Sequence, residues 1–183
     1  MSTTTTLFRF RIDLSDVERG IYEALDFRVA MHPSESMPYL LTRTLAYCLN
    51  IQEGLEFSPS GLHDPDTPTL TAKDRTGRIL LWIEIGNPNP RKLHKASKAA
   101  PQVKVYTYKN PEQLVREGQA ENIHRADQIE IFAFETSFLD RLAQNLTRDV
   151  RWSLLYNDRV LTVSTGNVSE QTEVKKFSFQ KDV

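Results

Sequence analysis

Glu84 is the residue whose surroundings most call for an explanation. It directly follows the apolar run 79–83, which predicts a central strand buried on both faces. A carboxylate next to such a run is costly unless it is paired, hydrogen-bonded or bound to a metal ion. Glu84 could therefore stand at the wet end of the strand, paired with a lysine or arginine, or it could belong to a site.

The hairpin expected around residues 74–77 decides where Asp66 lies relative to Glu84. If residues 75–77 form a three-residue loop, Pro68 lies opposite Glu84, and Asp66 and Glu84 share a face. Their Cα atoms would then be ~7–8 Å apart, so that both carboxylates could bind one Mg²⁺ or Mn²⁺ ion. A two-residue loop would instead place Asp66 on the opposite face.

Other residues near these acids have simpler interpretations as well. The segment 64–68 is typical of a turn, which would account for Asp66 alone. Glu35 is expected in the first turn of a helix, where an anion is favourable. Arg91, Lys95 and Lys98 follow helical spacing, which usually indicates a solvated basic face. However, their helix begins a few residues after Glu84, so its start should lie close to any site there.

Periodicity and turn residues predict the remaining elements. Strands are expected at 8–14, 21–31, 67–73, 78–85, 103–108, 128–135, 152–156, 159–164 and 172–179. Helices are expected from 34 to 49, from 89–90 onward, at 111–117 and at 137–146, with a loop at 54–68. Ser34 is the expected cap of the first helix, and Leu41, Leu45, Cys48 and Leu49 should face the core. The pattern predicts a single α+β domain over residues 1–183.

Composition limits the classes of function. The net charge of −1 does not favour general nucleic-acid binding, which relies on many basic contacts to phosphates. Cys48 is the single cysteine, so no internal disulfide can form, and a reducing compartment, the cytoplasm, is expected. No signal-peptide pattern opens the sequence, and no apolar run is long enough for a membrane span. His63 and His94 lack the spacing of a zinc site.

Two family resemblances bear on these acids. Pro65-Asp66 with Glu84-Ile85-Gly86 resembles the PD-(D/E)xK nuclease pattern, with Gly86 at the position of the lysine. Nearly the whole chain also resembles the bacterial YaeQ family. The residues that carry this second resemblance are His32-Pro33-Ser34-Glu35, Arg43, Asp66 with Pro68, Trp82-Ile83-Glu84-Ile85-Gly86 with Pro88, and Arg91 with Lys95-Ala96. It implies a mixed β-sheet with flanking helices, a variant of the restriction-endonuclease-like core with additional N- and C-terminal strands.

The resemblance also implies roles. Glu35, Asp66 and Glu84 would bind Mg²⁺ or Mn²⁺, and Lys95 would replace the missing strand lysine. Arg43 or Arg91 would contact phosphate. The leading hypothesis is metal-dependent hydrolysis of phosphodiester bonds in nucleic acid.

The alternative is a non-catalytic module on a degenerate nuclease fold that binds nucleic acid or a protein partner. Gly86 and the near-neutral charge favour the module, whereas the acids and the basic helix favour the enzyme. The oligomeric state stays open.

Overall fold

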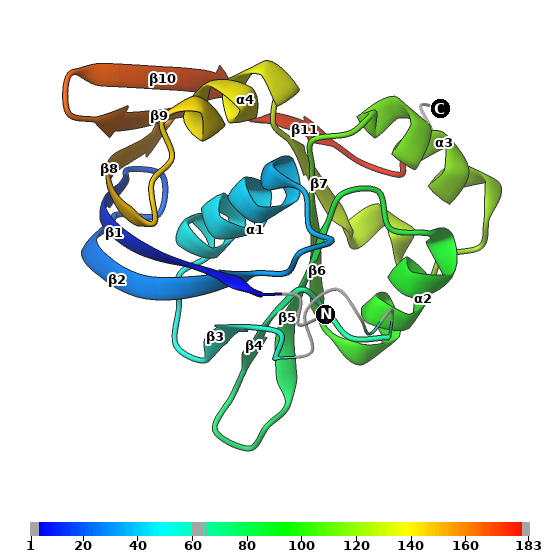
Figure 1. Cartoon of the computed structure of the whole chain (residues 1–183). Coiled ribbons are helices and arrows are strands. Elements are labelled where there is room, and N and C mark those ends of the chain that lie inside the picture. Colours follow the sequence, from blue (N-terminus) through cyan, green and yellow to red (C-terminus); the bar gives the residue numbers. More distant parts are fainter. Residues whose placement is uncertain (1–3, 60–63, 65, 181–183) are drawn as a thin grey trace.

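A computed structural model describes residues 4–59, 64 and 66–180, so His63 and Pro65 lie outside the described residues. The described chain forms two mixed sheets and four α-helices (Figure 1). The five-stranded sheet has the order β10 (Val168–Glu173), β9 (Val160–Thr165), β8 (Asp149–Asn157), β1 (Thr6–Asp16), β2 (Ile21–Met31). The six-stranded sheet has the order β11 (Lys175–Phe177), β7 (Glu130–Ala133), β6 (Gln102–Thr107), β5 (Ile79–Ile85), β4 (Leu70–Lys73), β3 (Leu55–Phe57). The helices are α1 (Met37–Leu49), α2 (Pro90–Ala99), α3 (Pro111–Ala120) and α4 (Thr136–Gln144).

Two sheets replace the single mixed sheet that was expected. The hairpin of β1 and β2 is confirmed, with Phe10 opposite Phe27. Strand β8 then joins the other edge of β1 in parallel, which extends a sheet separate from the six-stranded one. Strand β3 was missed, because three residues inside a loop-like sequence give too short a pattern to recognise.

The predicted last strand, 172–179, is divided between the two sheets. Strand β10 completes the five-stranded sheet and β11 the six-stranded one. Val174 lies between them, 1% exposed, and its N–H donates to the carbonyl of Arg159 at 2.7 Å. The alternation of apolar and polar residues predicts an extended segment. It cannot show that the segment passes from one sheet to the other, because a strand makes the same kind of backbone hydrogen bonds in either sheet.

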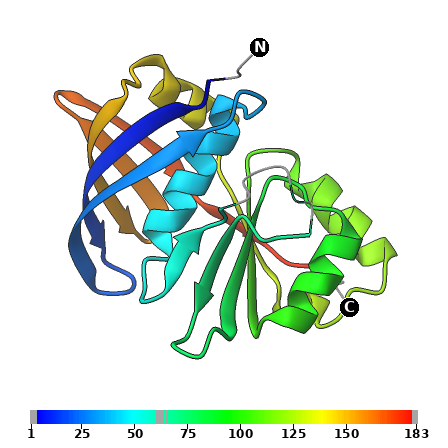
Figure 2. The same cartoon turned by 60° about the horizontal axis from the view of Figure 1, so that its bottom comes forward.

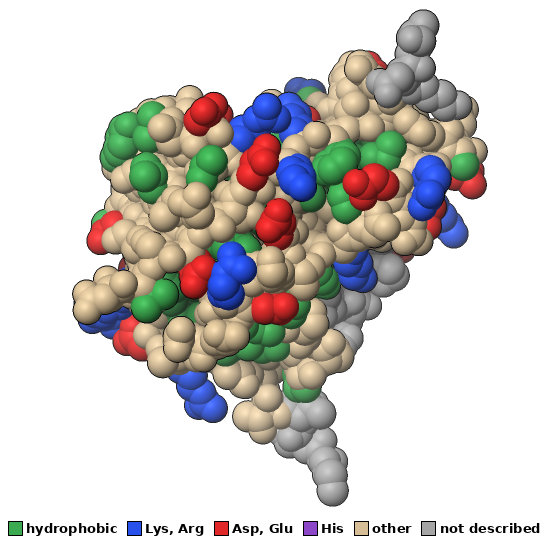
Figure 3. Space-filling view, turned by 90° about the horizontal axis from the view of Figure 1, so that it is seen from above, with side chains coloured by type: hydrophobic (Ala, Val, Ile, Leu, Met, Phe, Trp, Pro, Cys, Tyr) green, Lys and Arg blue, Asp and Glu red, His purple; other side chains and the backbone are tan. Residues whose placement is uncertain are grey.

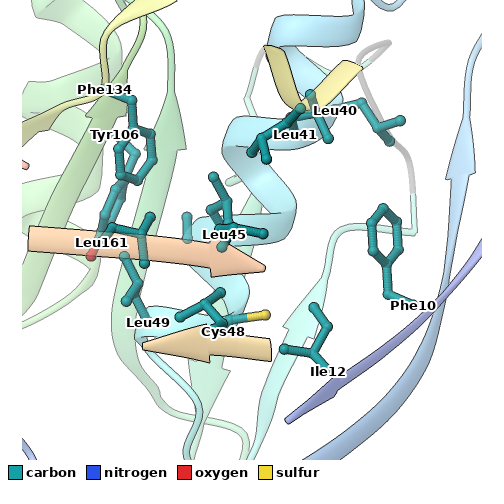
Figure 4. Close-up of a cluster of buried hydrophobic side chains, with 14 of the residues drawn as sticks. Phe10, Ile12, Leu40, Leu41, Leu45, Cys48, Leu49, Tyr106, Phe134 and Leu161 are labelled. Atoms are coloured by element: carbon teal, nitrogen blue, oxygen red, sulfur yellow. The ribbon is translucent and has the colours of Figure 1, made fainter. Parts of the chain in front are cut away.

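Helix α1 lies between the sheets and supplies the centre of the core (Figure 2). Its buried side chains meet residues of both sheets, among them Phe10 and Ile12 of β1 and Tyr106 of β6 (Figure 4). The four predicted core positions, Leu41, Leu45, Cys48 and Leu49, are all buried. Burial of one such leucine contributes about 1.5–3 kcal/mol, so this helix fixes how the sheets face each other.

The start of α1 differs from the prediction by two residues. Its N-cap is Ser36, whose hydroxyl accepts from the N–H of Tyr39 at 3.3 Å, not Ser34. Ser34 instead contacts the ring of His32. Glu35 therefore precedes the helix instead of lying in its first turn, and its contacts are not those of a helix-dipole residue.

Helices α2 and α3 cover the outer face of the six-stranded sheet, away from α1 (Figure 2). Leu93 and Ala96 of α2 pack against Trp82 and the neighbouring strand β6. Strand β5 thus has apolar residues on both faces, with Trp82 and Glu84 on the α2 side. Among the described helices, none combines the length and apolarity that a membrane crossing needs.

Candidate functional site

The turn between β4 and β5 forms as predicted. The N–H of Asp74 donates to the carbonyl of Arg78 at 3.0 Å, and Gly77 is left-handed with φ of +86°. The side chain of Asp74 accepts further bonds from residues of the turn. The pairing that was expected to place Asp66 beside Glu84 therefore starts correctly.

A β-bulge then shifts the register by one residue. Leu70 pairs with Ile83, and Leu80 has no partner in the ladder. Glu84 consequently faces Thr69 and not Pro68, the residue that was expected opposite it. The predicted register was therefore wrong beyond the bulge. Sequence alone could not locate the bulge, because Leu80 continues the apolar run although the residue is 38% exposed.

Glu84 is buried and fully partnered. Its Oε1 accepts from Trp82 Nε1 at 2.7 Å, and its Oε2 lies 2.9 Å from Lys92 Nζ. Burial raises the pKa of Glu84, while Lys92 and hydrogen bonds from Trp82 and Thr69 oppose this rise. Glu84 is thus paired with a lysine, as one interpretation expected, but inside the protein and not at a wet strand end.

Lys92 is the partner that sequence reasoning missed. The regular spacing of Arg91, Lys95 and Lys98 drew attention to another face of the helix. Asn89 caps α2 through a bond from the N–H of Lys92, which places Lys92 in the first turn, beside the end of β5. This cap was the available signal, since a first-turn lysine eight residues after Glu84 can turn back towards it.

Asp66 and Lys95 form a second, exposed pair. Lys95 Nζ lies 3.2 Å from Asp66 Oδ1, with side chains 51% and 77% exposed. Both line an open hollow of about 450 Å³ together with Asn89, Arg91 and Lys92. Arg91 and Lys95 therefore project to the same side of α2, as their spacing predicted. Lys95 contacts Asp66, however, whereas the lysine at Glu84 is Lys92.

Glu35 is held by Arg43 in an ion pair of its own. The guanidinium makes two bonds to the carboxylate, at 2.6 and 3.0 Å, and a third to the carbonyl of Ala30 at 2.7 Å. Glu35 also accepts from the N–H of His32 at 3.1 Å. The cation of Arg43 lies 5.4 Å from the ring centre of Phe57. Contacts within the protein thus occupy most of the Arg43 donors that were expected to contact phosphate.

A hydroxyl chain extends from Glu84 towards α1. Thr69 lies opposite Glu84 and helps to lower the pKa of its carboxyl, and Thr69 Oγ1 lies 3.2 Å from the hydroxyl of Tyr39. Burial raises the pKa of Tyr39, so the phenol stays protonated at neutral pH. Tyr39 and Thr69 are further site residues that the sequence did not reveal, because their proximity depends on the shifted register.

The three acids offer the oxygen donors that Mg²⁺ prefers, but their arrangement does not fit a shared ion. Glu35 pairs with Arg43, Asp66 with Lys95, and Glu84 with Lys92. Within the described part of the chain, no three Asp, Glu, His or Cys side chains gather as a metal centre. The expected common ion of Asp66 and Glu84 stays a prediction.

Fold and site together define a class: a two-sheet α+β domain that buries a carboxylate–lysine pair beneath a helix of its six-stranded sheet. The family model described as "YaeQ protein" matches residues 1–174, and the chain belongs to the YaeQ family. This confirms the family that the sequence resembled.

Relatives and solved structures agree with this assignment. The YaeQ proteins of Escherichia coli (strain K12) and Salmonella typhi are each 30% identical over 108 residues. The matched part spans 59% of this chain and 59% of each relative, less than two thirds of their length. The YaeQ structure from Pseudomonas syringae has a TM-score of 0.83 and 27% identity, and covers 97% of both chains. The structure from Xanthomonas axonopodis pv. citri has a TM-score of 0.85 and 26% identity, covering 98% of this chain and 100% of that one.

Proposed function

We propose that the chain hydrolyses phosphodiester bonds in nucleic acid at the α2 site, defined as Glu84, Lys92, Asp66, Lys95 and Arg91. The observation that carries this proposal is the buried ion pair of Glu84 and Lys92, 2.9 Å apart, beside an open hollow with basic walls. Perturbed carboxylates next to a cleft are candidates for catalysis. The resemblance to the PD-(D/E)xK pattern adds to this support.

Phosphate binding is the first task of such a site. Arg91 and Lys95 line the hollow and are exposed, so both can reach a phosphate from solvent. The N-terminus of α2 begins at the same hollow, where the helix dipole favours an anion. Arg91 can bind two phosphate oxygens at once through its guanidinium, whereas Lys95 acts as a point charge.

Glu84 and Lys92 would supply the chemistry. A carboxylate whose pKa is raised is a better base for a water proton than an ordinary one. The Lys92 ammonium would offset the negative charge that develops on the phosphate oxygens. Lys92 thereby takes the role that the sequence had suggested for Lys95. Binding of Mg²⁺ or Mn²⁺ by Glu35, Asp66 and Glu84 stays a prediction, and no step is assigned to an ion.

The non-catalytic module is the second candidate, and a specific observation favours it. Each of the three acids already has a basic partner, so the negative charge of these carboxylates is neutralised within the protein. Figure 3 shows Lys and Arg side chains interspersed with Asp and Glu on one face, without a continuous basic surface. Such a surface suits a protein partner better than general nucleic-acid binding. For either function we propose the cytoplasm, which suits the single free cysteine.

Nuclease assays on single- and double-stranded DNA and RNA test the proposal, each with Mg²⁺, Mn²⁺ or EDTA. We expect Glu84→Gln and Lys92→Met to lower the rate by at least about 10²-fold, the usual loss for a proton-transfer group. Lys98→Met is the matched control, because Lys98 is an exposed lysine of the same helix outside the hollow. Lys95→Ala shows whether the exposed pair contributes.

Three outcomes would each overturn a part of the proposal. Activity that survives Glu84→Gln would point to a contaminant or to another site. Binding of nucleic acid or protein without hydrolysis would establish the module instead. Calorimetric titration of wild type and Glu84→Gln with Mg²⁺ and Mn²⁺ addresses the ion, since equal heats would exclude Glu84 as its ligand.

A further inference from the structure

A second hollow, of about 520 Å³, lies on the outer face of the five-stranded sheet. Along β1, Phe8, Phe10 and Ile12 are buried towards α1, so Arg11 and Asp13 point to the opposite face. This face shares no lining residue with the α2 site. Any function of the second hollow is therefore independent of the proposed hydrolysis.

The hollow exists because short side chains lie between long ones. Ala24, Ser153 and Ser164 form its floor, together with Gly166. Ser153 and Ser164 are directly opposed across β8 and β9, so their positions are fixed by the ladder. Arg11, Asp26 and Arg151 line the hollow beside this floor. Its volume lies within the range of about 300–1,000 Å³ that is usual for small-molecule sites.

Two arginines face each other at the wall of this hollow. Arg11 of β1 and Arg151 of β8 are directly opposed in the parallel register. Neighbouring strands are ~4.8 Å apart, and like charges in opposed positions are destabilising. Counter-charges offset this repulsion on the Arg11 side, where Asp26 is directly opposite in the β1–β2 ladder and Asp149 lies 3.2 Å from the guanidinium. Even so, Nε of Arg11 is buried without a hydrogen-bond partner. Arg151 forms no ion pair with the residues described.

The acids of the same face leave room for an anion. Asp26 is bound by Arg9 through two hydrogen bonds, at 2.9 and 2.6 Å. Asp149 is held by Arg11. Asp13 is exposed at the other side of the hollow, opposite Ala24 and Ser153 in the two ladders. An anionic group should therefore bind at the arginine side, and hydroxyl or amino groups at Asp13.

We propose that this hollow binds the phosphate group of a small ligand. Arg11 and Arg151 bind the phosphate oxygens through their guanidinium groups. The hydroxyl of Ser153 donates to the same group, and so does that of Ser164, which can accept from the hydroxyl of Ser169 at the same time. Asp13 accepts from hydroxyl or amino groups elsewhere on the ligand. The phosphate can be free or belong to a nucleotide, and the two sources are distinguished by the choice of probe.

Calorimetric titration with inorganic phosphate, adenosine 5′-monophosphate and adenosine tests the proposal. We expect saturable binding of at least one phosphate compound by the wild type. Arg151→Gln should weaken it by at least about tenfold, the loss of one charge-assisted contact. Arg28→Gln, which removes the same charge from the same sheet outside the hollow, should change the affinity by less than about twofold. Tighter binding of the monophosphate than of phosphate, with none of adenosine, would identify a nucleotide.

Folding of the variants is followed without ligand, by thermal unfolding. Arg151→Gln should keep or raise the Tm, because one of two facing like charges is gone. Ser164→Val fills the floor without changing charge and should also weaken binding. Absence of saturable binding by the wild type with both phosphate compounds would overturn the proposal. Equal losses in Arg151→Gln and Arg28→Gln would do the same, since they would indicate unspecific attraction to the sheet.

Discussion

The ammonium of Lys92 lies 2.9 Å from the carboxylate of Glu84, and the two side chains are only 19% and 4% exposed. Removal of one partner leaves a buried charge without compensation, which costs about 3–5 kcal/mol. We expect Lys92→Met to lower the free energy of unfolding at pH 7 by this amount. The double variant with Glu84→Gln should recover most of it. Urea denaturation measures both, and a loss below about 1 kcal/mol in Lys92→Met would contradict the buried pair.

The stability of the protein should depend on pH through Glu84. Burial raises its pKa above the ordinary value of 4.5, so the folded state binds this proton more tightly than the unfolded state. Its stabilising contribution is complete below the unfolded pKa and is lost as pH rises through the folded pKa. Wild type should therefore gain stability relative to Glu84→Gln as pH falls towards 4.5. Urea denaturation of both proteins across this window measures the difference, and a constant difference would show an ordinary pKa.

The buried ion pair of Glu35 and Arg43 should contribute far more to stability than the exposed ion pair of Arg9 and Asp26. Both this pair and Arg9–Asp26 have a closest contact of 2.6 Å, but Glu35 is 2% exposed and Asp26 is 52% exposed. We expect Arg43→Ala to cost about 3–5 kcal/mol, because the buried carboxyl group of Glu35 loses its partner. Arg9→Ala should cost less than about 1 kcal/mol. Chemical denaturation of the two variants side by side checks the contrast, and similar losses would refute it.

Cys48 should be inert in the folded protein. Its side chain is fully buried in the core beside α1 neighbours, and burial raises the pKa of its thiol. The reactive thiolate is therefore scarce and inaccessible at neutral pH. We expect a thiol reagent to label Cys48 only as fast as the protein unfolds, and at once in concentrated urea. Rapid labelling under native conditions would show that α1 opens locally.

Much of the secondary structure could be predicted, because it depends on local periodicity. The alternation of β1 and β2 and the apolar stripe of α1 each identify an element and its buried face. The limits of elements were less certain. The cap of α1 moved from Ser34 to Ser36, because either serine can accept a helical N–H and only the course of the chain selects one.

The sequence identified residues of the candidate site, but it did not show which acid pairs with which base. Glu84 is buried and partnered, as the apolar run before it required. Its partner is Lys92, while Lys95 contacts Asp66. The cap at Asn89 places Lys92 in the first turn of α2, beside the end of β5. The bulge at Leu80 decides the other neighbour, because it brings Glu84 opposite Thr69. One residue of register decides the face of every side chain beyond it, and no local pattern records that shift.

The sequence by itself thus determined the α+β class, the core face of α1 and the presence of a carboxylate that needs a partner. These follow from burial and periodicity, which act over a few neighbouring residues. Only the tertiary structure decided that β10 and β11 belong to different sheets, that Lys92 is that partner, and that Arg11 faces Arg151. Each of these depends on contacts between segments that are distant in the sequence. The free energy of such contacts comes from side-chain packing and strand pairing, which local propensity does not describe.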